Sequence, residues 1–331
     1  MALVHLWLCL VGLVIILYVV LDGFSLGVGI LFPTAKCEEE RDVLMNSIAP
    51  VWDANQTWLV FGGGALFATF PMVYTVLFSA LYIPLLTFIF GLIFRGVAFE
   101  FRANSRNKAK WNRAFFCGSL VAVFAQGLTL GGYISGTTVV NGQFAGGALD
   151  WLQPFTVMVG LALIAGYVLL GATYLIIKTT GTVQERAYRQ AFQAALAVAA
   201  FMLVVSVWTP VLNPSIPGRW LSAPRVYFIW MFPLLGIGAF LFLLKSLRSR
   251  KILEPFLSSV VLFISAYLGL LAALHPYAIP PSVTVYEAAS QHETLVFTLW
   301  GACLVLPVVL GYNIYSYWVF RGKVLPEEGY H

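Results

Sequence analysis

Five ionisable residues lie inside or at the end of strongly apolar stretches in the first third of the chain. They are Asp22 in LYVVLDGFSLGVGI, Asp53 in APVWDANQTWLVFGGGALF, and Arg95, Glu100 and Arg102 in IFRGVAFEFR. An ionisable group at the centre of a membrane helix costs at least roughly 2.5 kcal/mol, so such a group usually has a charged partner or a function such as proton transfer. These residues are therefore the candidates for any chemistry that the chain performs.

Two of the carboxylates share a helix face with neutral polar side chains. Asp53, Gln56 and Thr57 stand at i, i+3 and i+4, and Asp22 and Ser25 stand at i and i+3. These spacings place side chains on one face of a helix. Carboxylates within membrane helices often belong to proton relays. We therefore predict a proton pathway formed by Asp53, Gln56, Thr57, Asp22 and Ser25, with Asp53 as its main residue.

The same charges also allow a structural interpretation, which stays open at this point. Arg95 would neutralise one of the aspartates, and Arg95, Glu100 and Arg102 would form a structural charge cluster. Arg95 and Glu100 are five residues apart, so on a helix they point in different directions and would find partners on other helices.

The surrounding sequence predicts an integral membrane protein made of helices. Hydrophobic residues make up 60% of the 331 residues and charged residues only 10%. A membrane-spanning helix needs about 20 mainly apolar residues, and a transmembrane β-barrel would instead show short alternating segments. We predict a single transmembrane helical domain over residues 1–331, with about nine spans. The expected spans are 5–32, 50–70, 73–99, 114–140, 154–177, 190–212, 224–245, 256–276 and 294–319.

The basic residues predict how these helices cross the membrane. With nine spans, all but three of the 19 Lys and Arg residues lie on one side; the exceptions are Arg95 within a span, and Arg219 and Arg225 on the opposite side. The positive-inside rule then places the N-terminus outside and the C-terminus in the cytoplasm. The basic loops would face anionic lipid headgroups, so the net charge of +5 does not indicate a nucleic-acid partner.

Depth in the membrane follows from this orientation and a rise of about 1.5 Å per residue. Asp22 would lie roughly 25 Å from the outer surface, near the cytoplasmic boundary, where water reaches it. Asp53 would lie within about a turn of the same boundary, with Arg95 at its edge and Glu100 just beyond. We therefore expect these four residues to meet at one level of the membrane.

Metal and haem ligands are scarce in the sequence. The four cysteines are scattered without a CxxC pair, and the four histidines, including His5, lie near span ends or in tails. A haem within the membrane needs an axial ligand placed there, and His5 is the one histidine left open for that role. We expect no metal site and no cofactor bound directly by this chain.

Three motifs in consecutive segments resemble subunit II of cytochrome bd-type quinol oxidases. They are DGFSLGVG, NSIAPVWDANQTWLVFGGGALFATFPMVY and FRGVAFEFR, and the similarity is closest to the cyanide-insensitive form. Two positions depart from the family pattern: Ala54 replaces the glycine of WDGN, and Ser25 replaces the second acidic residue of DGFDLG. The second departure removes a carboxylate from the first helix and weakens the case for a proton route along it.

The resemblance implies a fold, a partner and a reaction. The fold would be two four-helix bundles plus one peripheral helix, paired with a haem-bearing subunit I that carries haems b558, b595 and d, or a third haem b. The complex would lie in the bacterial cytoplasmic (inner) membrane, oxidise quinol through subunit I and reduce dioxygen with cytoplasmic protons. Asp53 would belong to the proton route. Small single-helix accessory subunits and a structural quinone or lipid in this subunit are compatible with the family.

A proton- or cation-coupled secondary transporter is the alternative function. Such transporters often contain inverted repeats and broken helices with sites near the membrane midplane. The chain has no evident repeat, and its charges are expected near one surface. A structural role in assembly of the oxidase also remains compatible with the sequence.

Overall fold

The computed structural model describes residues 1–212 and 225–324, which form an almost entirely helical protein. Eight described helices are long and apolar enough to cross a membrane, or nine if the bent pair α3/α4 is counted as one span. This confirms the prediction of about nine spans. The helices are α1 (Ala2–Leu31), α2 (Glu38–Ile48), α3 (Trp52–Thr69), α4 (Pro71–Ala80), α5 (Tyr82–Ala103), α6 (Lys108–Ser135), α7 (Pro154–Lys178), α8 (Gly181–Leu212), α10 (Arg225–Arg248), α11 (Glu254–Leu274), the short α12 (Val285–Ala288) and α13 (His292–Val319), with a 3-10 turn η1 (Phe32–Thr34) after α1.

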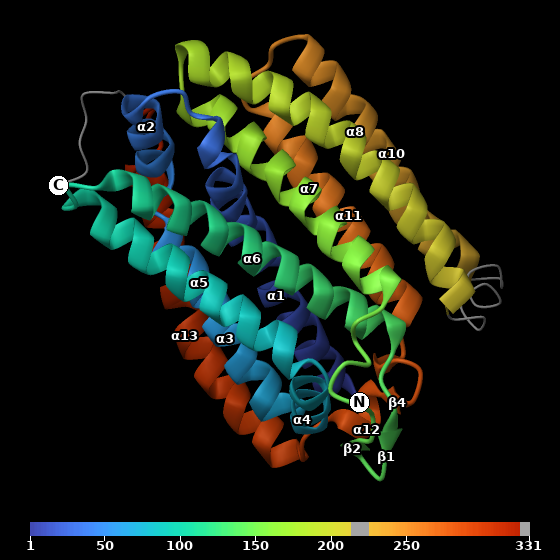
Figure 1. Cartoon of the computed structure of the whole chain (residues 1–331). Coiled ribbons are helices and arrows are strands. Elements are labelled where there is room, and N and C mark those ends of the chain that lie inside the picture. Colours follow the sequence, from blue (N-terminus) through green and yellow to red (C-terminus); the bar gives the residue numbers. More distant parts are fainter. Residues whose placement is uncertain (213–224, 325–331) are drawn as a thin grey trace.

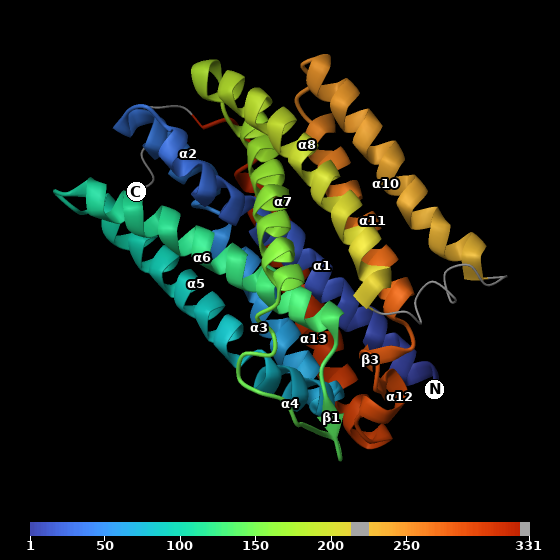
Figure 2. The same ribbon diagram turned by 45° about the vertical axis from the view of Figure 1, so that its right-hand side comes forward.

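The long helices form two groups of four (Figures 1 and 2). In the first group α1 packs on α3 and α6, and α5 packs on α6. In the second, α7 packs on α8 and α11, and α10 packs on α8 and α11. The last helix, α13, lies outside the first group against α3 and α1. The arrangement agrees with the expected two four-helix bundles plus one peripheral helix.

The boundary between the second and third spans differs from the prediction. The chain bends by 118° between α3 and α4, and α4 lies across the end of the bundle instead of beginning the next span. The third span is therefore α5, which begins at Tyr82, nine residues later than predicted. Pro71 at the start of α4 explains the break, because proline cannot continue a helix from the preceding residues but suits the first turn of a new one.

The two groups meet at a contact between the backbones of α1 and α7. A Cβ atom added to Gly27 would lie 1.8 Å from the Tyr167 carbonyl oxygen, and one added to Gly171 would lie 2.5 Å from the carbonyl carbon of Gly27. Only glycine permits so close a crossing, as in small-residue helix contacts of membranes. Gly63 and Gly64 on α3 make no such close contact with another helix, since a Cβ added to either would meet open space.

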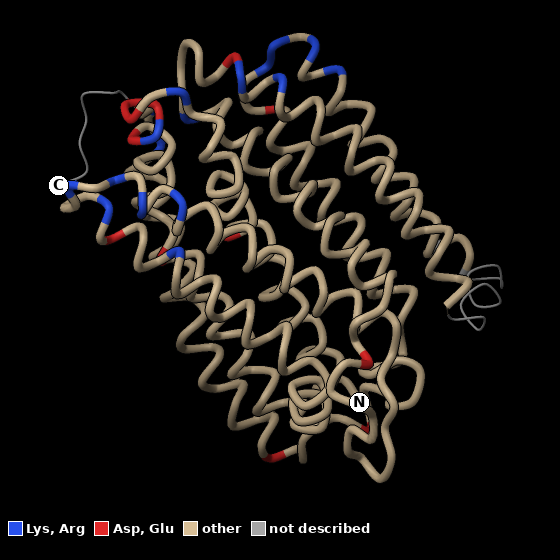
Figure 3. The backbone as a smooth tube through the Cα atoms, in the orientation of Figure 1, with Lys and Arg blue, Asp and Glu red and all other residues tan. Residues whose placement is uncertain are grey.

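The two ends of the molecule differ in charge and structure. One end, called the basic end here, carries α2 and the loops that join α5 to α6, α7 to α8 and α10 to α11; Lys and Arg gather there (Figure 3). The opposite end carries two small antiparallel hairpins, β1 (Val139–Val140) with β2 (Gln143–Phe144) and β3 (Tyr277–Ile279) with β4 (Val283–Thr284). Segment 279–293 of this end contains the last residue of β3, the strand β4 and the helix α12. The orientation of the basic end toward the cytoplasm stays a prediction.

Candidate functional site

A buried ion pair joins the first and third spans. Arg95 Nη1 of α5 donates to Asp22 Oδ1 of α1 over 3.1 Å, and the two side chains are 1% and 0% exposed. Asp22 lies nine residues before the end of α1 and Arg95 eight before the end of α5, which is about 12–14 Å of helix. The expectation that water reaches Asp22 at the membrane boundary is therefore wrong: Asp22 is enclosed by protein, and Arg95 is its partner.

Several polar atoms of the ion pair do not take part in the bond between Asp22 and Arg95. Within residues 1–212 and 225–324, Oδ2 of Asp22 and Nε and Nη2 of Arg95 have no hydrogen-bond partner within 3.5 Å, although the buried Tyr18 hydroxyl interacts with the Asp22 carboxylate. Buried polar atoms in proteins are normally satisfied, often by ordered water. The pair is thus suited to hold water inside the first bundle, which is the setting that proton transfer needs.

The predicted polar face of α3 points outward. Asp53 is exposed, while Gln56 and Thr57 are half-buried. Thr57 Oγ1 lies 3.4 Å from the Asp53 carbonyl oxygen, a bond within the helix. Asp53 still interacts electrostatically with Arg95, as Asp22 does. Asp53 therefore lies at the surface of the basic end, within reach of the field of the buried pair.

The inward position on α3 belongs to Asn55, which the sequence analysis missed. Its Nδ2 donates to the Leu21 carbonyl over 2.8 Å and lies 3.3 Å from Ser25 Oγ, and its Oδ1 accepts from Tyr317 of α13 over 2.8 Å. Asn55 and Ser25 are both fully buried. The signal was present as a second amide in DANQ, but spacing alone does not say which face of a helix is buried. Asn55 thus joins α3 to α1 at Leu21 and Ser25, and Asp53 takes no part in this contact.

The expected cluster of Arg95, Glu100 and Arg102 does not form. Arg95 belongs to the buried pair, and Glu100 is exposed on α5. Arg102 instead docks α2, since it donates to Glu38 over 2.8 Å and to Asp42 over 2.5 Å. These charges lie at two depths because about two turns of helix separate Arg95 from Arg102 on α5.

A larger set of ionic contacts holds α2 to its neighbours, and we call it the α2 network. Arg186 of α8 binds Glu40 through both terminal nitrogens, over 2.8 and 3.0 Å. Arg186, the Lys36 amide and Thr182 together lower the pKa of Glu40 to about 2, with the Arg186 hydrogen bonds as the main cause. The members of the network are Glu38, Glu40, Asp42, Arg102, Lys108, Asn112 and Arg186.

The described histidines do not suit haem ligation within the membrane. His5 is exposed at the hairpin end, where its ring nitrogens contact the Met1 carbonyl and the Tyr286 hydroxyl. His275 and His292 flank helices at that same end. Among the described residues there is also no group of three or more His, Cys, Asp or Glu side chains that could hold a metal ion.

Comparison with known proteins identifies the family. The model of the family "Cytochrome bd terminal oxidase subunit II" matches residues 3–320. The chain belongs to this family. Cytochrome bd oxidases are quinol oxidase complexes, so this subunit II is a multi-pass membrane component of such an enzyme. This family assignment decides against the secondary transporter.

Known subunits of this family are similar to this chain over nearly its whole length. The "Cytochrome bd-I ubiquinol oxidase subunit 2" of Escherichia coli (strain K12) is 29% identical over 360 residues, covering 97% of this chain and 95% of the relative. The "Cytochrome bd ubiquinol oxidase subunit 2" of Bacillus subtilis (strain 168) is 30% identical over 348 residues, covering 99% of both. A chain of the bd oxidase from Geobacillus thermodenitrificans has the same fold, with a TM-score of 0.77 at 16% identity over 98% of this chain and 100% of that one.

Proposed function

We propose that this subunit II pairs with the haem-bearing subunit I, supports its assembly and delivers protons from the cytoplasm to the oxygen-reducing haems. Quinol oxidation and the haems b558, b595 and d, or a third haem b, belong to subunit I in this proposal. The complex lies in the cytoplasmic (inner) membrane with the basic end of subunit II facing the cytoplasm. The observation that carries the proton route is the buried Asp22–Arg95 pair, whose remaining polar atoms have no hydrogen-bond partner within 3.5 Å in the described ranges.

The geometry supports a route that begins at the surface of α3. Asp53, with Gln56 and Thr57 on the same face, is accessible at the basic end and collects protons there. Arg95 interacts with both Asp53 and Asp22, so a proton arriving at Asp53 changes the field at the buried pair. Ser25, held by Asn55 next to Asp22 on α1, provides a hydroxyl beside the pair. Bound water would bridge the two levels, because Asp53 lies at the surface and Asp22 in the interior.

Replacing Asp53 with Asn tests the route. The Asp53→Asn variant removes the titratable group at the entrance and keeps its size, so we expect quinol-driven oxygen uptake to fall about 10-fold or more, in the range typical of a lost proton-transfer group. A reduced-minus-oxidised spectrum should show the full haem complement. The matched control is Glu185→Gln, which removes an exposed carboxylate of the basic end on α8 that pairs with Arg250; its uptake should equal that of the wild type.

Two outcomes would contradict the proposal. Unchanged oxygen uptake in Asp53→Asn with intact haems would exclude Asp53 from proton delivery. Loss of the haems together with the activity would assign Asp53 to assembly instead. A preparation of the chain that oxidises quinol without any haem-bearing partner would overturn the pairing itself.

A further inference from the structure

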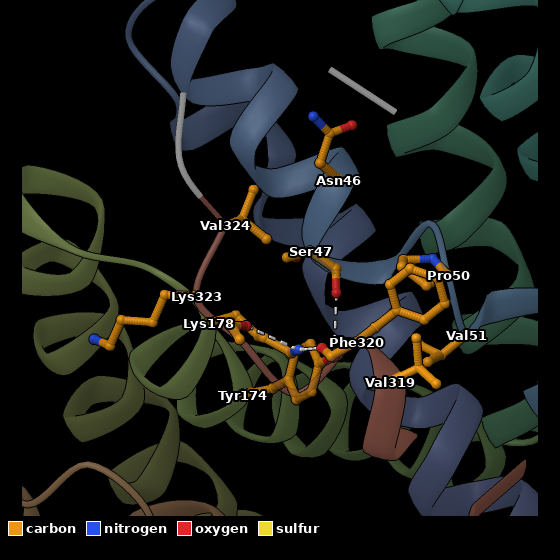
Figure 4. A pocket seen from close by; sticks show the side chains of 11 residues that line it. Asn46, Ser47, Pro50, Val51, Tyr174, Lys178, Val319, Phe320, Lys323 and Val324 are labelled. Atoms are coloured by element: carbon orange, nitrogen blue, oxygen red, sulfur yellow. Dashed lines mark hydrogen bonds between the residues drawn. The ribbon is translucent and has the colours of Figure 1, made fainter. Parts of the chain in front are cut away.

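A cavity of about 290 Å³ opens at the basic end, between α2, α7 and the segment that follows α13 (Figure 4). It lies apart from the Asp22–Arg95 pair and takes no part in the proposed proton route. Its walls are mostly apolar or backbone, and a single lysine reaches into it. The lining residues are Asn46, Ser47, Pro50, Val51, Tyr174, Lys178, Val319, Phe320, Gly322, Lys323 and Val324.

Lys178 brings a positive charge into this cavity without a counter-ion. The side chain is only 8% exposed, and its ammonium donates to the carbonyl oxygens of Phe320 and, over 3.2 Å, Gly322. None of the residues lining the cavity is Asp or Glu, and Lys178 forms no ion pair within residues 1–212 and 225–324. Carbonyl dipoles solvate an ammonium but leave its full charge in place. A buried charge without a partner is costly, so this position favours an anion.

The surrounding contacts keep the cavity open and fix its shape. The Val324 amide donates to the Lys178 carbonyl over 2.9 Å, and the Tyr174 hydroxyl donates to the Ser47 carbonyl over 3.1 Å. Lys323 points away from Lys178 in Figure 4 and donates to the Thr179 carbonyl over 2.9 Å. Lys323 therefore adds a second positive charge at the rim of the cavity. Its bond and that of Val324 hold the segment after α13 against the end of α7.

The apolar part of the wall continues onto the outer surface of the molecule. Val319 and Phe320 line the cavity and are 44% and 45% exposed, and Trp318 beside them is 62% exposed. α13 is the peripheral helix, and no other described part of the chain covers this apolar surface. A buried cation beside an apolar wall in a membrane protein suits a phospholipid, because basic pockets between helices bind anionic headgroups.

We propose that this cavity binds the phosphate of an anionic phospholipid, with Lys178 as its main contact and the acyl chains along Val319 and Phe320. A quinone or a zwitterionic lipid fits less well, because a neutral headgroup would leave the Lys178 charge unpaired. The site gives the last helix a lipid link to α7 and α2. It is independent of the proposed proton route, and its test does not depend on oxygen uptake.

Native mass spectrometry of the purified complex tests the site. After removal of lipid in a neutral detergent, the wild type should bind one phosphatidylglycerol in preference to phosphatidylcholine. The Lys178→Gln variant should bind phosphatidylglycerol about 10-fold more weakly, the loss expected for one charge-assisted contact. Lys178→Arg keeps the charge and should retain the preference. The control Lys251→Gln removes a 59% exposed lysine of the same end and should bind as the wild type does.

Other sources of the anion give different results. Glu327 and Glu328 follow Val324 in the sequence and lie outside the described residues. If their carboxylates occupy the cavity, the Glu327→Gln/Glu328→Gln variant will gain phosphatidylglycerol binding that the wild type lacks, and the proposal is wrong. Displacement of phosphatidylglycerol by millimolar inorganic phosphate would indicate a free-phosphate site instead. If Lys178→Gln fails to assemble, the wild type alone decides: equal binding of the two lipids overturns the proposal.

Discussion

The two sets of ionic contacts in this subunit differ in depth, partners and chemistry. The buried pair joins Asp22 and Arg95 by one hydrogen bond, with exposed fractions of 0% and 1%. In the α2 network, Arg102 is 4% exposed, but its partners Glu38 and Asp42 are 40% and 37% exposed. The α2 network therefore shares its charges with solvent, whereas the buried pair relies on one contact.

This difference indicates different roles. Surface ion pairs contribute little each but fix geometry when several act together, so the α2 network positions a helix. A buried pair repays the cost of desolvation only when its remaining polar atoms are satisfied. The polar atoms of Asp22 and Arg95 that lack hydrogen-bond partners therefore favour the proton route proposed above over a purely stabilising role.

Breaking the buried pair should have the largest effect. Arg95→Met leaves the Asp22 carboxylate buried without a partner, which costs about 3–5 kcal/mol. We expect a strongly lowered midpoint of thermal unfolding for the purified complex. The double variant Asp22→Leu/Arg95→Met removes both charges and should recover most of the stability while proton delivery stays impaired. A double variant as unstable as Arg95→Met would show that the two charges do not act as a pair.

Removing Arg102 should have an intermediate effect confined to α2. Arg102→Gln loses the contacts to Glu38 and Asp42 and leaves Asn112 without its 2.5 Å partner, at a cost of about 1–3 kcal/mol for charge-assisted bonds. Hydrogen exchange over residues 38–48 should quicken, with the other helices unchanged. Lys108→Gln, which removes one 3.3 Å surface contact to Asp42, is the control and should change exchange little. Equal effects of the two variants would contradict the central position of Arg102.

Protonation of Glu40 at low pH should have the smallest effect on stability. The folded pKa of about 2 lies below the ordinary value of 4.5, so the contact stabilises the protein above pH 4.5, and this contribution is lost as the pH falls from 4.5 toward 2. Glu40 lies at the protein surface with 14% of its side chain exposed, so we expect its contact with Arg186 to contribute about 1 kcal/mol to the free energy of unfolding. Glu40→Gln should lower the unfolding midpoint at pH 7 and reduce its dependence on pH below 4.5. An unchanged pH dependence would mean that Arg186 does not act on this carboxylate.

The sequence predicted those parts of the structure that depend on composition and periodicity. Nine apolar runs and the motifs around Asp22 and Asp53 sufficed for the span count, the bundle arrangement and the family. Glycine by itself does not predict close packing, since Gly27 lies at a helix crossing whereas Gly63 and Gly64 face open space.

The remaining errors concern how deep a residue lies within its span and which face of a helix is buried. The spacing of residues along the sequence does not determine either. The bounds of a span fix the depth of its residues, and the third span begins nine residues later than predicted because α4 turns aside at Pro71. The polar face of α3 was recognised, but whether Asp53 or Asn55 points inward depends on where α1 and α13 pack. A single helix pattern contains no record of such contacts between distant segments.

The bond between Asn55 and Tyr317 has a consequence for how the protein is made. The two residues are 262 positions apart, so α3 is synthesised long before the residue that completes its buried amide. Until the last helix packs against α3, the Asn55 side-chain oxygen lacks this donor. A chain that ends before α13 therefore leaves this amide incompletely bonded, and the arrival of the final helix completes its hydrogen bonds.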